Sequence, residues 1–135
     1  MSTNNEVNKK RRIANRKIVG GITVTNVTAL NKFTAISKIG TMVDASSTGL
    51  LLLIDRKDLI PKGLRESLSL EQLMGEHVML RIAEMNLDID GVISRTRHIG
   101  KGMFELALDF SLDAPEYWRE CLVDLLPAPG EMSDS

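Results

Sequence analysis

The stretch Asp44-Ala45-Ser46-Ser47-Thr48-Gly49-Leu50-Leu51-Leu52-Leu53-Ile54 joins a cluster of turn-forming residues to the longest apolar run in the chain. Short polar side chains followed by a glycine favour a tight turn. The aliphatic residues after the turn fit either a buried strand or a short buried helix. The shortness of this run and the turn before it favour the strand. The sequence therefore predicts a strand that begins directly after a turn.

On both sides of this stretch, apolar residues alternate with polar ones, as is typical of strands. The first such run begins at Ile18, and Asn26 is expected to interrupt it. Gly100-Lys101-Gly102 predicts a hairpin turn between the last two runs. About six strands with few helices predict a mainly β fold, a closed or nearly closed antiparallel barrel. The alternating residues include Ile18, Ile22 and Val24, then Phe33, Ala35 and Ile39, then Val78, Leu80 and Ile82, and finally Phe104, Leu106, Leu108 and Phe110.

One α-helix is expected near the C-terminus, where it would cap the barrel. Asp113 suits the N-cap, Pro115 suits the first turn, and Glu116 completes a capping-box pattern. Pro127 would end this helix. Between residues 55 and 74, Pro61 and Gly63 break the pattern, and Ser69-Leu70-Glu71-Gln72 could start one helical turn, so this segment is expected to be a connector.

The composition predicts a single domain. The chain has 135 residues, of which 43% are hydrophobic, enough for one ordinary core. We expect a disordered N-terminus at residues 1–8, the domain at residues 9–127 and a disordered acidic tail at residues 128–135. The single Cys121 excludes an internal disulfide framework, and no apolar run is long enough to span a bilayer. Without a signal-peptide pattern, the expected location is the cytoplasm, with no membrane contact.

Positive charge is concentrated near the N-terminus. The segment from Lys9 to Lys17 holds six of the 17 basic residues, and Met1 to Val43 carries a net charge of +7 (eight basic residues and Glu6). Residues 113–135 carry −5 (six acids and one arginine). The basic end attracts anions and the acidic end repels them. This distribution predicts a local site for an anionic ligand rather than stable binding of nucleic acid.

Two motifs carry the chemistry of such a site. Arg12 and Arg16 form an Arg-x-x-x-Arg pair, and a guanidinium can fork onto phosphate oxygens or onto the O6 and N7 edge of guanine. Asp44, Ser46 and Gly49 form Asp-x-Ser-x-x-Gly, in which the carboxylate can accept from guanine and the glycine allows close approach to the backbone. Alone, the first motif is typical of a solvated basic tail and the second of an Asx turn.

In this order, with strands between them, the two motifs resemble those of the PilZ domain, a family of bacterial cyclic di-GMP receptors. The resemblance covers most of the chain and implies a six-stranded PilZ-like β-barrel preceded by a flexible basic N-terminal arm. It implies that Arg12 and Arg16 bind guanine and phosphate, while Asp44 and Ser46 meet a guanine on the barrel surface, in a ligand site that also includes Gly49. It also suggests that Arg11 helps to hold a stacked, intercalated ligand dimer.

Other candidate sites are weaker. Asn86, Asp88 and Asp90 begin like a calcium loop, but the twelfth position is Arg97 instead of glutamate. His77, His98 and Cys121 lack metal-ligand spacing, so no metal site is expected. Arg95 and Arg97 share one face of a strand, which is typical of a solvated face, although they could extend the anionic site. No nucleophile–base pair or catalytic carboxylate pair stands out, so we expect neither an enzyme nor a cofactor.

The expected function is a receptor that binds cyclic di-GMP, orders its N-terminal arm and thereby signals to an unidentified effector protein. The alternative is a PilZ-like adaptor that binds protein but no nucleotide. A third possibility is a small barrel that binds nucleic acid through its basic arm. It is disfavoured because only 4% of the residues are aromatic, too few for a stacking surface.

Overall fold

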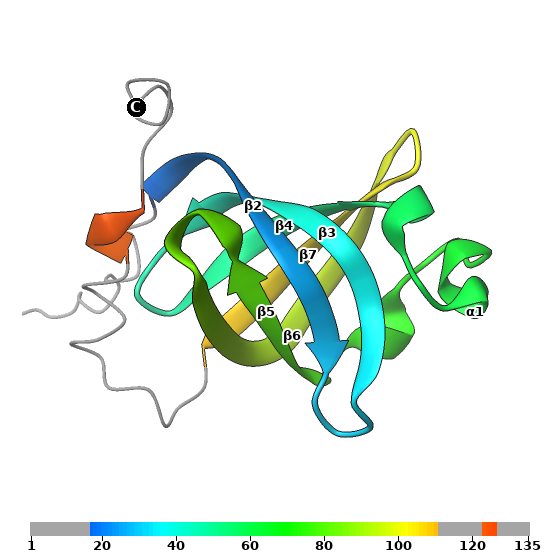
Figure 1. Ribbon diagram of the computed structural model, residues 1–135. Coiled ribbons are helices and arrows are strands. Elements are labelled where there is room, and N and C mark those ends of the chain that lie inside the picture. The colour runs from blue at the N-terminus through cyan, green and yellow to red at the C-terminus, as the bar shows by residue number, and fades with distance from the viewer. Residues whose placement is uncertain (1–16, 111–122, 127–135) are drawn as a thin grey trace, which may run out of the picture.

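The computed structural model describes residues 17–110 and 123–126. Within them, six antiparallel strands close into a barrel in the order β2-β3-β4-β7-β6-β5, with β5 pairing back to β2 (Figure 1). This architecture confirms the predicted mainly β, six-stranded antiparallel barrel. The strands are β2 (Lys17–Ala29), β3 (Thr34–Ala45), β4 (Gly49–Asp55), β5 (His77–Ile82), β6 (Leu87–Gly100) and β7 (Met103–Phe110).

The core follows from alternation along the strands. In β4, Leu50, Leu52 and Ile54 are buried inside the barrel, whereas Leu51 and Leu53 face outward and stay half-buried. β7 pairs with β4 residue by residue and places Phe104 in the core opposite Ile54. The apolar run of β4 is therefore a strand, as predicted, with one face in the core.

Asn26 does not interrupt the first strand, so that prediction was wrong. β2 continues through Asn26, which adopts a left-handed conformation with φ of 56°. The pairing of β2 with β5 shifts between Thr25 and Thr28, and its pairing with β3 shifts between Val27 and Thr28, as at a β-bulge. The extra residue changes the phase of the alternation, so that Val24 and Val27 are both buried.

The connector after β4 folds over one end of the barrel (Figure 1). It contains η1 (Arg56–Asp58), α1 (Lys62–Arg65) and η2 (Glu71–Leu73). Arg56 Nη1 donates to the backbone oxygens of Arg65 and Ser67, and Arg65 Nη1 donates to those of Leu59 and Ile60. Two arginines thus hold together a segment for which the sequence predicts no regular structure. The connector adds Leu59, Leu64, Leu70 and Leu73 to the core. A further short turn, η3 (Ala83–Met85), joins β5 to β6.

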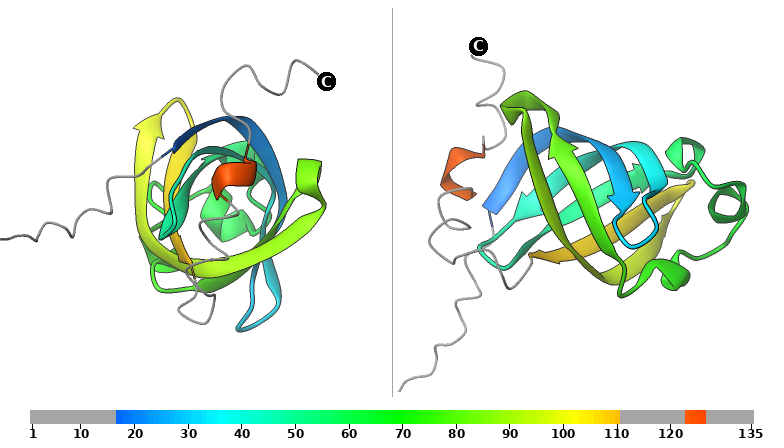
Figure 2. Two further views of the ribbon diagram at one scale, coloured as in Figure 1. Left: turned by 90° about the vertical axis from the view of Figure 1, so that its left-hand side faces the viewer. Right: turned by 60° about the horizontal axis from the view of Figure 1, so that its bottom comes forward.

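The opposite end carries a helical turn at residues 123–125 (Figure 2). Leu126 is buried there, and Lys17 Nζ donates to the backbone oxygens of Val123 and Leu126 at 3.3 and 2.6 Å. The expected helix from Asp113 onward otherwise lies outside the described residues, as do the N-terminal segment before Lys17 and the acidic tail. In the described part of the chain, no helix has the length and apolarity needed to cross a membrane.

Candidate functional site

The turn between β3 and β4 presents the Asp-x-Ser-x-x-Gly motif. The backbone N–H of Ser46 donates to the oxygen of Gly49 at 2.8 Å and closes the turn. The Ser46 hydroxyl accepts from the Thr48 N–H at 3.2 Å and lies 2.9 Å from the Thr48 hydroxyl. Ser46 is buried, so its main interactions brace the turn. The motif therefore stabilises the turn, in line with the turn that its sequence predicts.

Gly49 is required by close backbone packing. A Cβ atom at this position would lie 2.0 Å from the backbone oxygen of Leu108 on β7. Atoms cannot approach so closely without displacing the strand. The turn is tied to β7 a second time, because the N–H of Phe110 donates to the oxygen of Thr48 at 2.9 Å. The last residue of the motif thus fixes the turn against the barrel.

The start of β2 lies beside this turn. In the β2–β3 ladder, Lys17 pairs with Ala45 and Ile18 pairs with Asp44. The basic arm is therefore attached to the barrel next to Asp44. Lys17 itself belongs to the barrel, because it pairs in β2 and its ammonium binds the C-terminal turn. The expected flexible arm ran from Lys9 to Lys17, and this expectation was wrong for Lys17.

The predicted site residues fall into two groups. Asp44, Ser46 and Gly49 come together at one turn. Arg11, Arg12 and Arg16 lie outside the described residues, so their predicted contacts with the ligand stay predictions.

A row of outward-facing residues extends from Asp44 across the barrel surface. The strand pairings place Asp44 opposite Leu51, Leu51 opposite Ala107, and Ala107 opposite Arg95. Adjacent strands lie about 4.8 Å apart, so these three steps span about 14 Å. Asp44 and Arg95 thus flank a half-buried apolar centre, and the exposed Ile18 continues the row beyond Asp44. We call this row the platform, and its residues are Ile18, Asp44, Leu51, Ala107 and Arg95.

A small pocket opens at the far end of the platform. Its volume is about 80 Å³, and it lies between the β3–β4 turn, the bulge of β6 and the end of β7. The register of β6 against β7 shifts between Ile93 and Arg95, which leaves Ser94 as an extra residue. The Ser94 hydroxyl lies 3.2 Å from Asp109 Oδ1 and 3.3 Å from the backbone oxygen of Ala107. The polar side chains that line the pocket are Ser46, Thr48, Ser94, Arg95 and Asp109.

Sequence reasoning missed most of these pocket residues. Thr48 lies in the β3–β4 turn, Ser94 in the middle of β6 and Asp109 near the end of β7, and their spacing in the sequence is not distinctive. Only the bulge and the strand pairing bring them together. Arg95 and Arg97 were noted as neighbours on one face, and the structure separates their roles. Arg97 forms an ion pair with Glu105 at 2.9 Å, whereas Arg95 lines the pocket.

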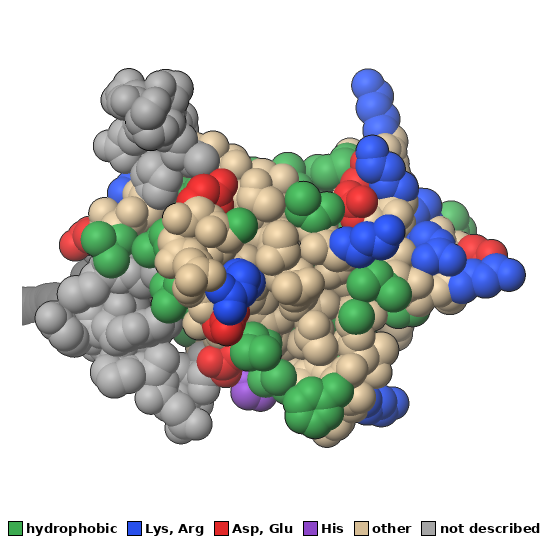
Figure 3. Space-filling model, in the orientation of Figure 1, with side chains coloured by type: hydrophobic (Ala, Val, Ile, Leu, Met, Phe, Trp, Pro, Cys, Tyr) green, Lys and Arg blue, Asp and Glu red, His purple; other side chains and the backbone are tan. Residues whose placement is uncertain are grey.

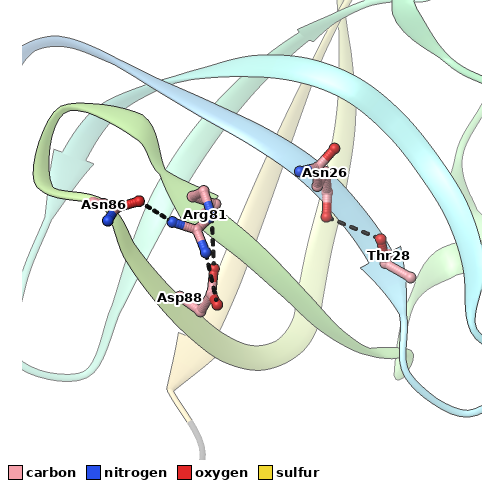
Figure 4. A network of polar contacts seen from close by, with 5 residues as sticks. All are labelled: Asn26, Thr28, Arg81, Asn86 and Asp88. Atoms are coloured by element: carbon pink, nitrogen blue, oxygen red, sulfur yellow. Dashed lines mark hydrogen bonds and ion pairs between the residues drawn. The ribbon is translucent and has the colours of Figure 1, made fainter.

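The calcium-like run is used in cross-strand pairing. Arg81 on β5 donates to Asn86 and forms an ion pair with Asp88 at 3.2 Å (Figure 4). His77 Nε2 lies 2.6 Å from Asp90 Oδ2. Asp88 and Asp90 thus belong to the outward face of β6, and Asn86 belongs to the turn before it. Among the described residues, no group of three or more His, Cys, Asp or Glu side chains is placed to hold a metal ion.

Lys and Arg side chains also gather at the end of the barrel covered by the connector (Figure 3). Several of these cations lie beside acids, with Lys57 at 4.0 Å from Asp55 and Lys62 at 3.9 Å from Glu66. Arg56 and Arg65 are engaged with backbone carbonyls. Four of the cations at this end thus have partners among the described residues.

No family model matches the chain, and no curated protein matches it significantly.

Proposed function

We propose that this chain is a PilZ-like receptor that binds cyclic di-GMP between its basic N-terminal arm and the β3–β4 turn. One observation carries the proposal most directly. The β2–β3 ladder attaches the arm beside Asp44, because Lys17 and Ile18 pair with Ala45 and Asp44. The residue that follows Arg16 in the chain thus lies beside the second motif, although Lys17 and Asp44 are 27 positions apart in the sequence (44 minus 17).

The residues of the two motifs would contact different parts of the ligand. Arg12 and Arg16 supply forked guanidinium groups for phosphate oxygens and the guanine O6 and N7 edge, and Arg11 adds positive charge. The carboxylate of Asp44 accepts from guanine N1 and N2. Ser46 braces the turn, and Gly49 keeps the turn close to β7.

The shape of the described surface favours a ligand that lies across the barrel. Pockets that enclose a small ligand usually measure about 300–1,000 Å³, whereas the pocket beside the turn measures only about 80 Å³. A dinucleotide is therefore too large for this pocket but has room on the platform. The half-buried Leu51 and Ala107 offer an apolar surface for the faces of the bases. A basic arm would cover the ligand from the other side.

The mechanism is an ordering switch in a cytoplasmic receptor. Binding would fix the arm over the ligand and change the surface that the protein offers to an effector protein. The mechanism needs neither a catalytic group nor a cofactor, since the dinucleotide is bound and not converted.

A specific observation favours the adaptor as the second candidate. Phe33, in the turn between β2 and β3, is 81% exposed. It also adopts a left-handed conformation with φ of 52°, which is unusual for a bulky residue. An aromatic side chain held in this way suits contact with another protein. Phe33 is compatible with both functions, because a receptor also needs a surface for its effector.

Calorimetric titration with cyclic di-GMP separates the two candidates. Charge-assisted contacts contribute about 1.5–3 kcal/mol each, and ordering a segment on binding costs about 2–5 kcal/mol. Several such contacts predict dissociation in roughly the micromolar range. Heat of binding with saturation in that range supports the receptor. Its absence at millimolar ligand would leave the adaptor.

A further inference from the structure

Arg95 and Arg97 differ in one respect that bears on binding. Both are exposed residues of β6, two positions apart. Arg97 is paired with Glu105, opposite it on β7. Arg95 lies opposite Ala107, and its side chain forms no ion pair or hydrogen bond within the described residues. Its guanidinium is therefore available at the far end of the platform.

The pocket beside Arg95 offers donors and acceptors together. The Ser46 and Thr48 hydroxyls bond to each other, so one of their two protons stays available for another acceptor. Asp109 accepts from Ser94 at Oδ1, and a carboxylate has further lone pairs for a second donor. Arg95 and Asp109 carry opposite charges, which makes the pocket close to neutral. A second phosphate would meet the repulsion of Asp109, whereas a neutral group with mixed polarity would not.

The edge of a guanine is a neutral group that carries both donors and acceptors. Guanine presents the acceptors O6 and N7 beside the donors N1–H and N2–H, and arginine binds O6 and N7 with two parallel hydrogen bonds. Adenine replaces the O6 acceptor with an amino donor, which would face the guanidinium unfavourably. A pocket of about 80 Å³ admits the edge of a base, whose face would then lie on Ala107 and Leu51.

We infer that Arg95 and Asp109, brought together by the bulge at Ser94, read the edge of a second guanine at the far end of the platform. This inference rests on the proposed function, because it concerns the same ligand surface. Arg95 stands about 14 Å from Asp44 along the sheet, three strand spacings away, while the pocket itself extends back to Ser46 of the β3–β4 turn. Asp44 and Arg95 therefore contact different bases, either of one cyclic dinucleotide or of two stacked ones.

The test is calorimetric titration of cyclic di-GMP into four proteins: the wild type, Arg95→Ala, Arg95→Lys and Arg97→Ala. Arg95→Ala should weaken binding about tenfold or more, because a bidentate contact to guanine is lost. Arg95→Lys should lose nearly as much, since an ammonium keeps the charge but not the planar fork. Arg97→Ala is the matched control and should change affinity less than about twofold. Melting temperatures should show that all four proteins are folded.

The possible outcomes are distinct. Full affinity in Arg95→Lys together with a loss in Arg95→Ala would mean that the site senses charge, and guanine reading would be overturned. Full affinity in Arg95→Ala would remove Arg95 from the site and leave the proposed function standing. Failure of the wild type to bind cyclic di-GMP would overturn both. Equal losses in Arg95→Ala and Arg97→Ala would point to general positive charge and would also overturn the inference.

Discussion

Lys17 lies opposite Ala45 in the β2–β3 ladder, and its ammonium group binds backbone oxygens of the C-terminal turn. The first described residue of the barrel is therefore held both by the strand that ends in the Asp44–Gly49 turn and by residues 123–126. This double attachment fixes the point from which the basic arm begins. We therefore expect a ligand held by that arm to lie near Asp44.

The arginines of the arm should dominate affinity. Arg12→Ala or Arg16→Ala should each weaken cyclic di-GMP binding about tenfold or more, because each removes a charge-assisted contact of about 1.5–3 kcal/mol. Neither arginine is expected to support the core, so the melting temperature of the ligand-free protein should not fall. Titration calorimetry and thermal denaturation measure the two effects. Unchanged affinity in both variants would remove the arm from the site.

The arm should also report binding through proteolysis. The segment from Lys9 to Arg16 offers several trypsin sites and few apolar side chains, so cleavage there should be fast without ligand. Cyclic di-GMP should protect these bonds while leaving cleavage elsewhere little changed. Mass spectrometry of timed digests locates the protected bonds. Equal rates with and without ligand would argue against a closing arm.

Gly49 should be essential for stability whatever the ligand. Gly49→Ala places a Cβ 2.0 Å from the Leu108 oxygen, so the turn or β7 must move. We expect a loss of about 3 kcal/mol or more in the free energy of unfolding. Gly63→Ala is the matched control, because nothing lies within 4 Å of the added atom in helix α1. That substitution should leave stability unchanged or raise it by up to about 1 kcal/mol. Urea denaturation compares the two, and similar stability of both variants would contradict the close packing at Gly49.

The barrel could be predicted from the sequence because its signals are local. Alternation along Val78-Met79-Leu80-Arg81-Ile82 and the glycines at Gly100 and Gly102 predict a strand and a hairpin turn, and the structure contains both. The bulge at Asn26 could not be predicted in this way. A single extra residue breaks the local period, and only pairing with two neighbouring strands shows that the strand continues.

The candidate site was predictable only in part. Asp44, Ser46 and Gly49 stand close together in the sequence, so their meeting in one turn follows from chain connectivity. Arg95 and Asp109 meet because β6 and β7 pair with a shifted register. No spacing in the sequence records that shift. The connector was equally unpredictable, since Arg56 and Arg65 hold it through backbone carbonyls that any residue supplies.

The central claim is that Asp44 and the arm recognise guanine, and cyclic di-AMP tests it most directly. Both cyclic dinucleotides carry the same two phosphates. Adenine lacks the N1–H and N2–H groups that would donate to the Asp44 carboxylate, and it lacks the O6 acceptor for arginine. A desolvated carboxylate left without a donor weakens binding strongly. Asp44→Ala should therefore reduce the preference for cyclic di-GMP more than added salt does.

The decisive measurement is the ratio of the two dissociation constants for the wild-type protein in one buffer, obtained by titration calorimetry. We predict that cyclic di-GMP binds at least about a hundredfold more tightly than cyclic di-AMP, as expected for a site built on hydrogen bonds to the base. Equal affinity for the two dinucleotides would show that the arm senses charge alone and would contradict guanine recognition by Asp44.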